Sequence, residues 1–334
     1  MKGVLLVNLG SPDSTSTKDV KKYLSEFLMD KMVMNMSYLF RLILVKGIIL
    51  RTRPEKSANA YKKIWWKEGS PLIILSERLQ KKVQQLVTVP VSLGMRYGSM
   101  TIQKGLEELK SKGVDEVFVM PLYPHFAMSS YETVVEKAKS VQKANFPNMD
   151  LNFLPVFYNN PDYITVMVNN IKDQLKDFDY DHILFSYHGL PESHIRKADV
   201  SKGHGKFVIT EDCCSDPMDT CYRFQVFETT RLIVKKLQLK EGTYSNAFQS
   251  RLVNEPWLQP YTDTEIERFA KQGKKKLAVI TPAFVTDCLE TLEEIAMEGK
   301  GQFLDNGGES YKFVPCLNDN DDWASVVAKW IKNN

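Results

Sequence analysis

The residues from Ile183 to Pro191 read Ile-Leu-Phe-Ser-Tyr-His-Gly-Leu-Pro and carry two signals of a parallel sheet. The apolar run at the start is typical of a strand buried on both faces. The glycine and proline predict a tight turn directly after the strand, and this turn carries His188. Ligands of open parallel sheets bind at the carboxyl ends of the strands, so His188 is a candidate functional residue. A histidine in this position also often serves in packing, and the stretch alone leaves both interpretations open.

A second apolar run, residues 277–280, precedes an acidic helix that we predict over residues 287–298. Asp287 is a natural N-cap and Glu290 falls at the third helical position, which favours a capping box and a structural role for both. Glu290 and Glu294 are one turn apart, about 6 Å along the helix axis, so this pair also suits the passage of a hard cation or a proton along one face. Considered alone, the helix favours the structural interpretation.

Apolar runs alternate with amphipathic helical patterns, and the pattern occurs twice along the chain. Strands alternating with helices imply an α/β fold of parallel sheets with helices on both faces. We expect one domain at residues 1–149, a second at 150–318, and a C-terminal helix at 319–334 that packs back on the body. The predicted strands cover residues 4–8, 89–93, 116–120, 151–156, 182–187, 244–248, 277–281 and 312–315.

The composition of the 334 residues is that of an ordinary soluble globular protein, with 43% hydrophobic and 25% charged residues. The net charge of +3 gives no support for nucleic-acid binding. The N-terminus reads as a strand rather than a signal peptide, and five cysteines without an export signal favour a reducing, cytoplasmic location without disulfides. The sequence lacks G-x-G-x-x-G after the first strand, a P-loop, H-E-x-x-H and G-x-S-x-G, so dinucleotide, nucleotide and Ser-triad chemistry have no support.

Residues 27–50, which we call the lip, are rich in methionine, aromatic and aliphatic side chains. Arg41 and Lys46 interrupt the apolar run, so it falls short of the about 18 uncharged residues that span a bilayer. The simplest interpretation is a core helix with flexible methionines that fill gaps. The alternative is an apolar surface that grips a large flat ligand or touches a membrane.

Other histidines and the cysteines give weaker signals. His125 follows a predicted strand and is a candidate to line a pocket, whereas His194 lies in polar, lysine-rich sequence and is expected to be solvated. Cys213, Cys214 and Cys221 have a spacing that matches no standard zinc pattern, so reduced, partly buried thiols are the default.

Several motifs, in the right order, resemble the ferrochelatase family, whose members insert ferrous iron into a porphyrin in the terminal steps of haem synthesis. The resemblance covers nearly the whole chain. It implies two similar Rossmann-like domains with parallel four-stranded sheets flanked by helices and a porphyrin cleft between them. The matching motifs are Val-Asn-Leu-Gly-Ser-Pro at 7–12, Gly-Met-Arg-Tyr at 94–97, Leu-Tyr-Pro-His at 122–125, Phe-Ser-Tyr-His-Gly-Leu-Pro at 185–191, Phe-Gln-Ser-Arg at 248–251, Pro-Trp-Leu at 256–258, Tyr-Thr-Asp at 261–263 and residues 283–292.

The resemblance implies that His188 and Glu290 face each other across the centre of the macrocycle, which reverses the structural interpretation of Glu290. We expect His188 to accept pyrrole protons and contact the metal, and Glu290 to be a metal ligand or proton conduit, although the two roles are exchangeable. Asp287 and Glu294 are expected to support them. The family's porphyrin-binding positions, where Arg96 would meet polar or anionic groups, correspond to Arg96, Tyr123, Ser129 and Trp257.

The chain also departs from the family. Cys288 stands where some members have a histidine, and Met128 stands at the internal cysteine that helps bind a [2Fe–2S] cluster in animal members. That cluster is expected to be absent, and no resident cofactor is expected, although a different cluster on Cys213, Cys214 and Cys221 is a disfavoured alternative.

The expected partners are a porphyrin, with protoporphyrin IX favoured, and ferrous iron. We expect a monomer or weak dimer, with the lip a candidate for peripheral contact at the inner membrane face. The alternatives are a cobalt or nickel chelatase for another tetrapyrrole and a non-catalytic haem or porphyrin carrier.

Overall fold

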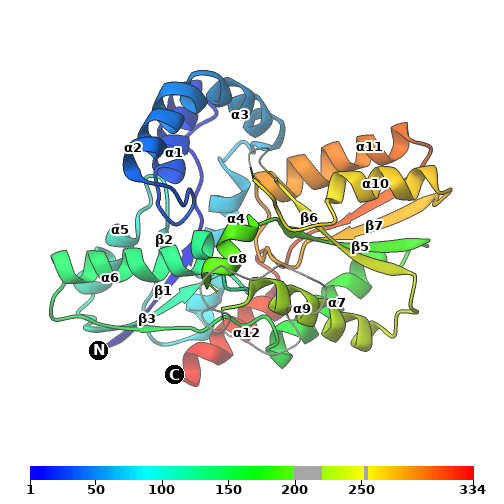
Figure 1. The fold of residues 1–334 in the computed structure, drawn as a ribbon. Helices are drawn as coiled ribbons and strands as arrows, with labels where there is room; N and C mark the ends of the chain where they lie inside the picture. The colour runs from blue at the N-terminus through cyan, green and yellow to red at the C-terminus, as the bar shows by residue number, and fades with distance from the viewer. Residues whose placement is uncertain (199–219, 252–254) are drawn as a thin grey trace. The chain divides into compact units, whose positions relative to one another are not determined.

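Eight parallel strands form two separate four-stranded sheets in the computed structural model, which describes residues 1–198, 220–251 and 255–334 (Figure 1). Each sheet is the centre of one compact unit. The first unit comprises Met1–Tyr123, Met128–Pro155 and Asn318–Asn334, and the second comprises Pro124–Ala127 and Val156–Leu317. The predicted α/β architecture of two parallel sheets flanked by helices is therefore confirmed.

The first sheet has the strand order β2-β1-β3-β4, and every neighbouring pair is parallel. The unit continues past residue 149 because β4 pairs with β3. Its strands are β1 (Lys2–Asn8), β2 (Val91–Met95), β3 (Glu116–Pro121) and β4 (Asp150–Phe153). Its helices are α1 (Thr17–Leu28), α2 (Tyr38–Leu42), η1 (Ile43–Ile49), α3 (Leu50–Ile64), α4 (Pro71–Leu86), α5 (Ile102–Ser111), η2 (Met128–Glu132), α6 (Thr133–Asn145) and α12 (Asp321–Lys332).

The central strand β1 is apolar along its length because both faces of the sheet are covered. Leu5 and Val7 form a core cluster with Leu106 of α5 and Val134 of α6. At the carboxyl end of β1, Gly10 has φ +104°, and a Cβ there would lie 1.9 Å from the carbonyl oxygen of Tyr97. Glycine therefore lets the loop after β1 press against the loop after β2.

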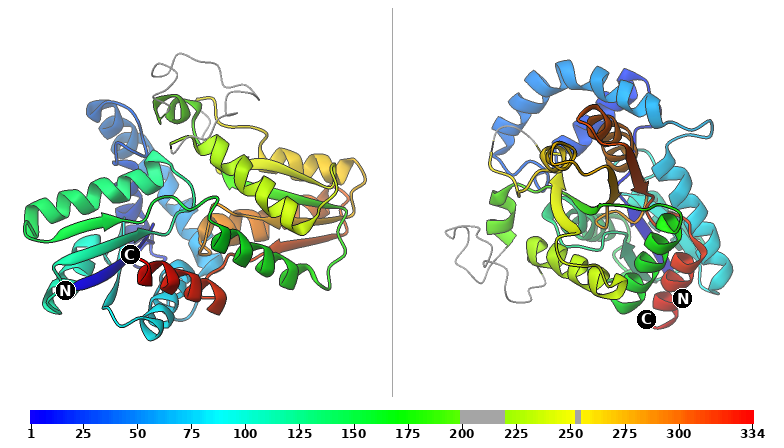
Figure 2. Two further views of the ribbon diagram at one scale, coloured as in Figure 1. Left: turned by 90° about the horizontal axis from the view of Figure 1, so that it is seen from below. Right: turned by 90° about the vertical axis from the view of Figure 1, so that its right-hand side faces the viewer.

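The last helix, α12, packs against α4 of the first unit (Figure 2). Trp323 of α12 is fully buried, and Asn320 caps the helix by accepting hydrogen bonds from two backbone N–H groups. Lys82 of α4 pairs with Asp321 across 2.8 Å. The C-terminal helix thus belongs to the first unit, although the chain reaches it from the second.

The second sheet repeats the same topology with the order β6-β5-β7-β8. One of its faces packs against α10, η4 and α11, whose residues share a core cluster with the strands, while α7 and α9 lie on the other side (Figure 1). Its strands are β5 (His182–His188), β6 (Tyr244–Gln249), β7 (Lys276–Ile280) and β8 (Ser310–Val314). Its helices are α7 (Pro161–Leu175), α8 (Glu192–Ala198), α9 (Tyr222–Leu237), α10 (Thr262–Lys271), η4 (Glu290–Gly299) and α11 (Lys300–Asp305).

The acidic helix differs from the prediction in type and in its first residue. It is the π-helix η4, which begins at Glu290 rather than at Asp287. Helices of this type are rare and often occur at functional sites. η1 and η2 are also π-helical, and they fall in the lip and around Ser129, two of the segments that the family resemblance had marked for the porphyrin.

Candidate active site

His188 is the last residue of β5 and lies half-buried at the carboxyl edge of the second sheet. Its Nδ1 is 2.6 Å from the carbonyl oxygen of Gly189. A carbonyl oxygen only accepts hydrogen bonds, so Nδ1 must carry the proton and Nε2 of the neutral ring keeps its lone pair. The side chain therefore presents Nε2 as a base or a metal ligand.

The turn after His188 is held closely against β6. The backbone N–H of Gly189 donates to the carbonyl of Gln249 across 2.7 Å. A Cβ on Gly189 would lie only 2.7 Å from that same oxygen and 3.3 Å from the ring of Trp257, so the turn requires glycine at this position. Trp257 is buried and pairs through its backbone with Pro191, so the tryptophan that we predicted to contact porphyrin lies beside the histidine turn.

Glu290 is tied to the same strand edge. The β5–β6 register places His188 opposite Gln249, and the side-chain amide of Gln249 donates to the backbone carbonyl of Glu290 across 3.1 Å. The side-chain oxygen of Gln249 accepts a hydrogen bond from Ser186 across 2.8 Å. One buried glutamine thus links the turn that follows His188 to the first residue of η4.

η4 carries four glutamates, of which Glu293 is buried, and the other three lie four residues apart. Glu290 and Glu294 are half-buried, whereas Glu298 is exposed. Burial raises the pKa of Glu294 to about 7, repulsion from Glu290 and Glu298 acts in the same direction, and hydrogen bonds from Ser250 oppose it. Glu294 is therefore suited to exchange a proton near neutral pH.

Ser250 holds Glu294 with both its backbone and its side chain. Its N–H donates to Oε1 of Glu294 across 2.8 Å, and its hydroxyl donates to Oε2. Ser250 has φ +66°, a left-handed conformation that is uncommon outside glycine and recurs at functional sites. We did not predict Ser250 from the sequence as a site residue, because its only signal there is its place in the Phe-Gln-Ser-Arg motif.

A pocket of about 310 Å³ lies beside the C-terminal half of η4, where Glu294 and Glu298 line it. Arg251 pairs with Asp263 across 2.5 Å at the pocket wall and stacks on Tyr261. The pocket has both polar and apolar walls, and it offers carboxylates that a cation or a proton can reach. Its polar lining comes from Ser250, Arg251, Asp263, Glu294, Glu298 and Gln302.

Asp287 lies before η4 and does not cap it in the way that we predicted. Its buried carboxylate accepts hydrogen bonds from the hydroxyl of Thr291 across 2.9 Å and from the backbone N–H of Cys316 across 3.3 Å. The expected capping box with Glu290 is wrong because η4 begins at Glu290 itself, which leaves Asp287 three residues outside the helix. Asp287 anchors the start of η4 to the segment that follows β8.

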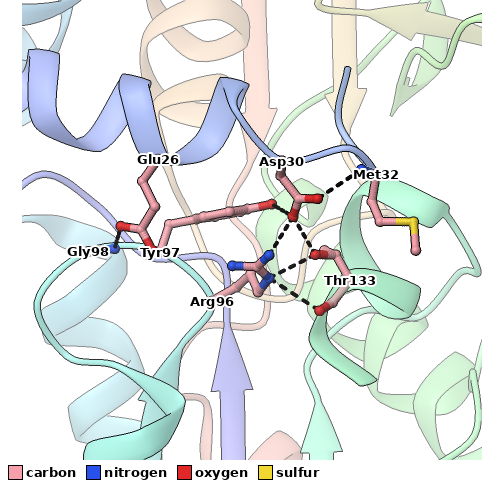
Figure 3. A network of polar contacts seen from close by, with 7 residues as sticks. All are labelled: Glu26, Asp30, Met32, Arg96, Tyr97, Gly98 and Thr133. Atoms are coloured by element: carbon pink, nitrogen blue, oxygen red, sulfur yellow. Dashed lines mark hydrogen bonds and ion pairs between the residues drawn. The ribbon is translucent and has the colours of Figure 1, made fainter. Parts of the chain in front are cut away.

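In the first unit, Arg96 is engaged in a polar network (Figure 3). Its guanidinium pairs with the carboxylate of Asp30 across 2.5 Å and also donates to the hydroxyl and the carbonyl of Thr133. Ser129 lies half-buried in η2, and Tyr123 lies two residues beyond β3, packed against the core cluster of this unit. Asp30 and Thr133 were missed in the sequence because they are far from Arg96 along the chain.

Two histidines differ from the expectation. His125 is fully buried among Tyr158, Tyr187 and Tyr222, and burial lowers its pKa to about 3, so it is a neutral core residue rather than a pocket-lining one. His194 is 4% exposed rather than solvated.

The cysteines are described only in part. Cys213 and Cys214 lie outside the described residues, and Cys221 is buried, with its sulfur accepting a hydrogen bond from the N–H of Phe224 at the start of α9. Among the described residues, no group of three or more His, Cys, Asp or Glu side chains is arranged to hold a metal ion.

The lip carries apolar side chains that are open to solvent. Tyr38, Leu39, Phe40, Ile43 and Ile48 are each more than half exposed. In the part of the chain that the structure describes, no helix is both long and apolar enough to cross a membrane.

Comparison with known proteins gives the same family as the motifs. A family model described as Ferrochelatase matches residues 1–334. A ferrochelatase of Pseudomonas fluorescens is 45% identical over 330 residues, which cover 97% of this chain and 96% of the relative. A ferrochelatase of Azotobacter vinelandii is 46% identical over 331 residues, which cover 98% of this chain and 97% of the relative.

Solved structures also show a similar fold. SirB from Bacillus subtilis, determined with Fe3+, superposes with a TM-score of 0.54 over 99% of this chain and 94% of that chain, at 10% sequence identity. A likeness at this identity concerns the fold alone, and it agrees with two parallel sheets flanked by helices.

Proposed function

Because the chain belongs to the ferrochelatase family and so inserts ferrous iron into a porphyrin to make haem, we propose that His188 and Glu290 perform this insertion, with protoporphyrin IX as the substrate. The main support is the arrangement around Gln249, which fixes the histidine turn and the first residue of the acidic helix at one sheet edge. The reaction exchanges two pyrrole N–H protons for one Fe(II), so the site needs a proton acceptor and a route for charge.

His188 is the proposed acceptor of the pyrrole protons. The Nδ1 proton is committed to the carbonyl of Gly189, which leaves the lone pair of Nε2 for a proton or for iron. Imidazole binds Fe(II) without the tight hold of a thiolate site, so the metal can pass on to the macrocycle. A histidine held by its backbone neighbour keeps this orientation before substrate arrives.

Glu290, Glu294 and Glu298 are the proposed route along η4. Glu290 is the inner member and either binds the incoming iron or receives a proton. Glu294, with a pKa of about 7, takes up and releases protons at little cost near neutral pH. The pocket lined by Glu294 and Glu298 supplies the outer end of the route. Iron entry and proton exit are both compatible with this row, and Asp287 supports it by fixing the start of the helix.

The porphyrin contacts are proposed for Tyr123, Ser129 and Trp257 together with the lip. Aromatic rings stack on a flat macrocycle, and the apolar side chains of the lip suit a porphyrin with few carboxylates. This favours protoporphyrin over more carboxylated porphyrins.

We also propose that the lip contacts an anionic membrane surface. Between Met32 and Pro54 the sequence has four cationic residues and no acidic one. Exposed apolar side chains flanked by Arg and Lys are the pattern of a segment that lies in a lipid interface. Of the cationic residues, Lys46, Arg51 and Arg53 are exposed, whereas Arg41 is buried.

No resident cofactor is proposed. The thiol of Cys221 is 3% exposed and is used as a helix cap, which favours a structural role over cluster ligation. Iron and acid-labile sulfide analysis of anaerobically purified protein tests this, and stoichiometric amounts of both would contradict it.

The central experiment follows the absorbance of metalloporphyrin formed from protoporphyrin IX and Fe(II), with coproporphyrin III, Co(II) and Ni(II) run beside them. His188→Ala and Glu290→Gln are each expected to lower kcat at least about 100-fold while porphyrin binding is retained. Glu267→Gln, on an exposed position of α10, is the matched control and should keep parental turnover. Parental turnover in both site variants would refute the assignment, and a preference for Co(II) or Ni(II) or for coproporphyrin would refute the substrate.

A further inference from the structure

Asp30 lies in the part of the lip that follows α1, and its carboxylate is surrounded by donors (Figure 3). Oδ2 accepts hydrogen bonds from Arg96 across 2.5 Å, from the hydroxyl of Tyr97 across 2.8 Å and from the hydroxyl of Thr133 across 2.6 Å. Oδ1 accepts one from the N–H of Met32 across 2.8 Å. A single carboxylate therefore receives four donors, three of them from two segments remote in sequence.

The pair between Asp30 and Arg96 differs from an ordinary surface ion pair. The Asp30 side chain is 7% exposed and that of Arg96 is 12% exposed, so water screens the pair little. Burial by itself would raise the pKa of Asp30, but the donors from Thr133 and Met32 and the charge of Arg96 hold it below its usual value. Asp30 thus remains ionised, and the charge of Arg96 is already balanced inside the protein.

The network joins three segments of the first unit, and two of them carry or adjoin proposed porphyrin contacts, namely the lip and Ser129. Asp30 and Met32 belong to the entrance of the lip, Arg96 and Tyr97 to the loop after β2, and Thr133 to the start of α6, directly after the π-helix that carries Ser129. The donors from Arg96, Tyr97 and Thr133 hold the loop after β2 and the start of α6 against the segment that carries Asp30.

Arg41 stabilises the C-terminal end of the same segment, residues 34–36, by hydrogen bonds. The guanidinium of Arg41 is buried and donates to the backbone carbonyls of Met34 and Met36. The segment between α1 and α2 is therefore held at Asp30 on one side and by Arg41 on the other. Directly beyond it, α2 presents the exposed side chains of Leu39 and Phe40.

The edge of the Arg96 guanidinium formed by Nε and Nη2 is already engaged within the protein. Nε donates to the hydroxyl and carbonyl of Thr133, and Nη2 donates to Asp30. The guanidinium also lies 4.3 Å from the centre of the Tyr97 ring. A porphyrin carboxylate that took the place of Asp30 would leave a buried aspartate without its cation, which is unfavourable.

We propose that Asp30 is a positioning residue that, through Arg96, Tyr97 and Thr133, holds the lip in the conformation that captures porphyrin, and that Arg96 acts through Asp30 rather than as a partner of an anionic group on the substrate. This inference rests on the proposed function, since it assumes that the lip grips the porphyrin.

The test compares Asp30→Asn with the parent for a porphyrin with two carboxylates and one with four. Porphyrin binding is measured by fluorescence quenching, kcat and KM are measured separately, and hydrogen exchange is followed over residues 31–49. Loss of the Asp30 network should raise Kd and KM about tenfold for both porphyrins alike and change kcat less than about twofold at saturating porphyrin. It should also lower the hydrogen-exchange protection of residues 31–49. Glu265→Gln, which removes another poorly exposed carboxylate paired with arginine, is the matched control and should leave all three readouts unchanged.

Two further variants keep the test decisive. Thr133→Val removes a single donor to Asp30 and should shift the same quantities in the same direction by a smaller factor, even if Asp30→Asn folds poorly. Asp30→Asn combined with Arg96→Gln should be no worse than the poorer single variant, because both break one network. Tighter binding of the four-carboxylate porphyrin by Asp30→Asn would show that the freed Arg96 binds anions and would overturn the proposal, as would unchanged affinity in both variants.

The outcome is separable from that of the proposed function. If His188→Ala retains turnover, the catalytic assignment fails while the binding and exchange results for Asp30 still stand. If Asp30→Asn leaves affinity unchanged while His188→Ala loses turnover, only the positioning role of Asp30 is refuted.

Discussion

Gln249 donates a hydrogen bond from its side-chain amide to the backbone carbonyl of Glu290 across 3.1 Å. The backbone carbonyl of the same residue accepts a hydrogen bond from Gly189, next to His188. Gln249 is 3% exposed, and its side-chain oxygen is satisfied by Ser186. Both proposed catalytic groups are therefore positioned by one buried residue, Gln249, whose backbone holds the turn after His188 and whose side-chain amide holds Glu290.

Replacing Gln249 with leucine should disturb this arrangement while keeping a side chain of similar volume. The variant leaves the carbonyl of Glu290 and the hydroxyl of Ser186 short of one partner each, so the free energy of unfolding should fall by about 1–3 kcal/mol. We expect kcat to fall about tenfold or more, because Glu290 loses its fixed position, while porphyrin affinity changes less. Denaturant titration and steady-state kinetics measure the two effects.

Ser186→Ala is the control for this variant, since it removes the donor to Gln249 but leaves the bond to Glu290 in place. It should lower stability with a smaller loss of kcat. An equal loss of kcat in the two variants would mean that the contact with Glu290 is not what matters.

Gly189→Ala should damage the turn after His188 by a steric route. The added Cβ would lie 2.7 Å from the carbonyl of Gln249 and 3.3 Å from the Trp257 ring, so the turn must move away from β6. We expect a destabilisation of about 1–3 kcal/mol and a clear loss of kcat. Gly301→Ala, on α11 with open space around its Cβ position, should be tolerated and serves as the same substitution without the clash. Parental kcat in Gly189→Ala would contradict the close approach.

The strands and the histidine turn could be predicted from the sequence because their signals are local. Strands buried on both faces read as continuous apolar runs, and Ile183, Leu184 and Phe185 are all fully buried in β5. The order of strand, turn and helix then places His188 at a carboxyl edge without knowledge of any long-range contact. The proposed role of Glu290 comes from the family motifs, because helix capping alone favoured a structural role.

The remaining features depend on contacts that no local pattern contains. The residues of η4 would fit an α-helix equally well, so its π-helical hydrogen bonding has no local sequence signal. Asp30 and Arg96 are 66 residues apart, and nothing near Arg96 indicates that its charge is already paired. His194 looked solvated because its neighbours are polar, yet the fold buries it.

Stability should depend on pH through Glu294. Its pKa is raised from 4.5 to about 7 in the folded protein, mainly by burial, so the native state binds the extra proton between these values. The contribution is fully present below pH 4.5 and is lost as the pH rises through about 7. The free energy of unfolding should therefore fall over this window by an amount on the order of 3 kcal/mol.

Glu294→Gln should remove most of this slope, because the amide stays neutral throughout. Urea titrations at several pH values between 4.5 and 7.5 measure it. Glu107→Gln, at an exposed position of α5, should keep the parental slope. If Glu294→Gln shows the same slope as the parent, another group titrates in this range.

The exposed apolar side chains of the lip should govern contact with lipid. Leu39 is 64% exposed, so Leu39→Asn should change the free energy of unfolding by less than about 0.5 kcal/mol. Binding to vesicles that contain anionic lipid should weaken several-fold, because an apolar side chain no longer enters the interface. Leu304→Asn, at an exposed position of α11 outside the lip, is the same substitution and should bind vesicles like the parent. Higher salt should weaken the parent's binding, because it screens the attraction between anionic lipid and the exposed residues Lys46, Arg51 and Arg53. Equal vesicle binding by the parent and Leu39→Asn would restrict the lip to gripping the porphyrin.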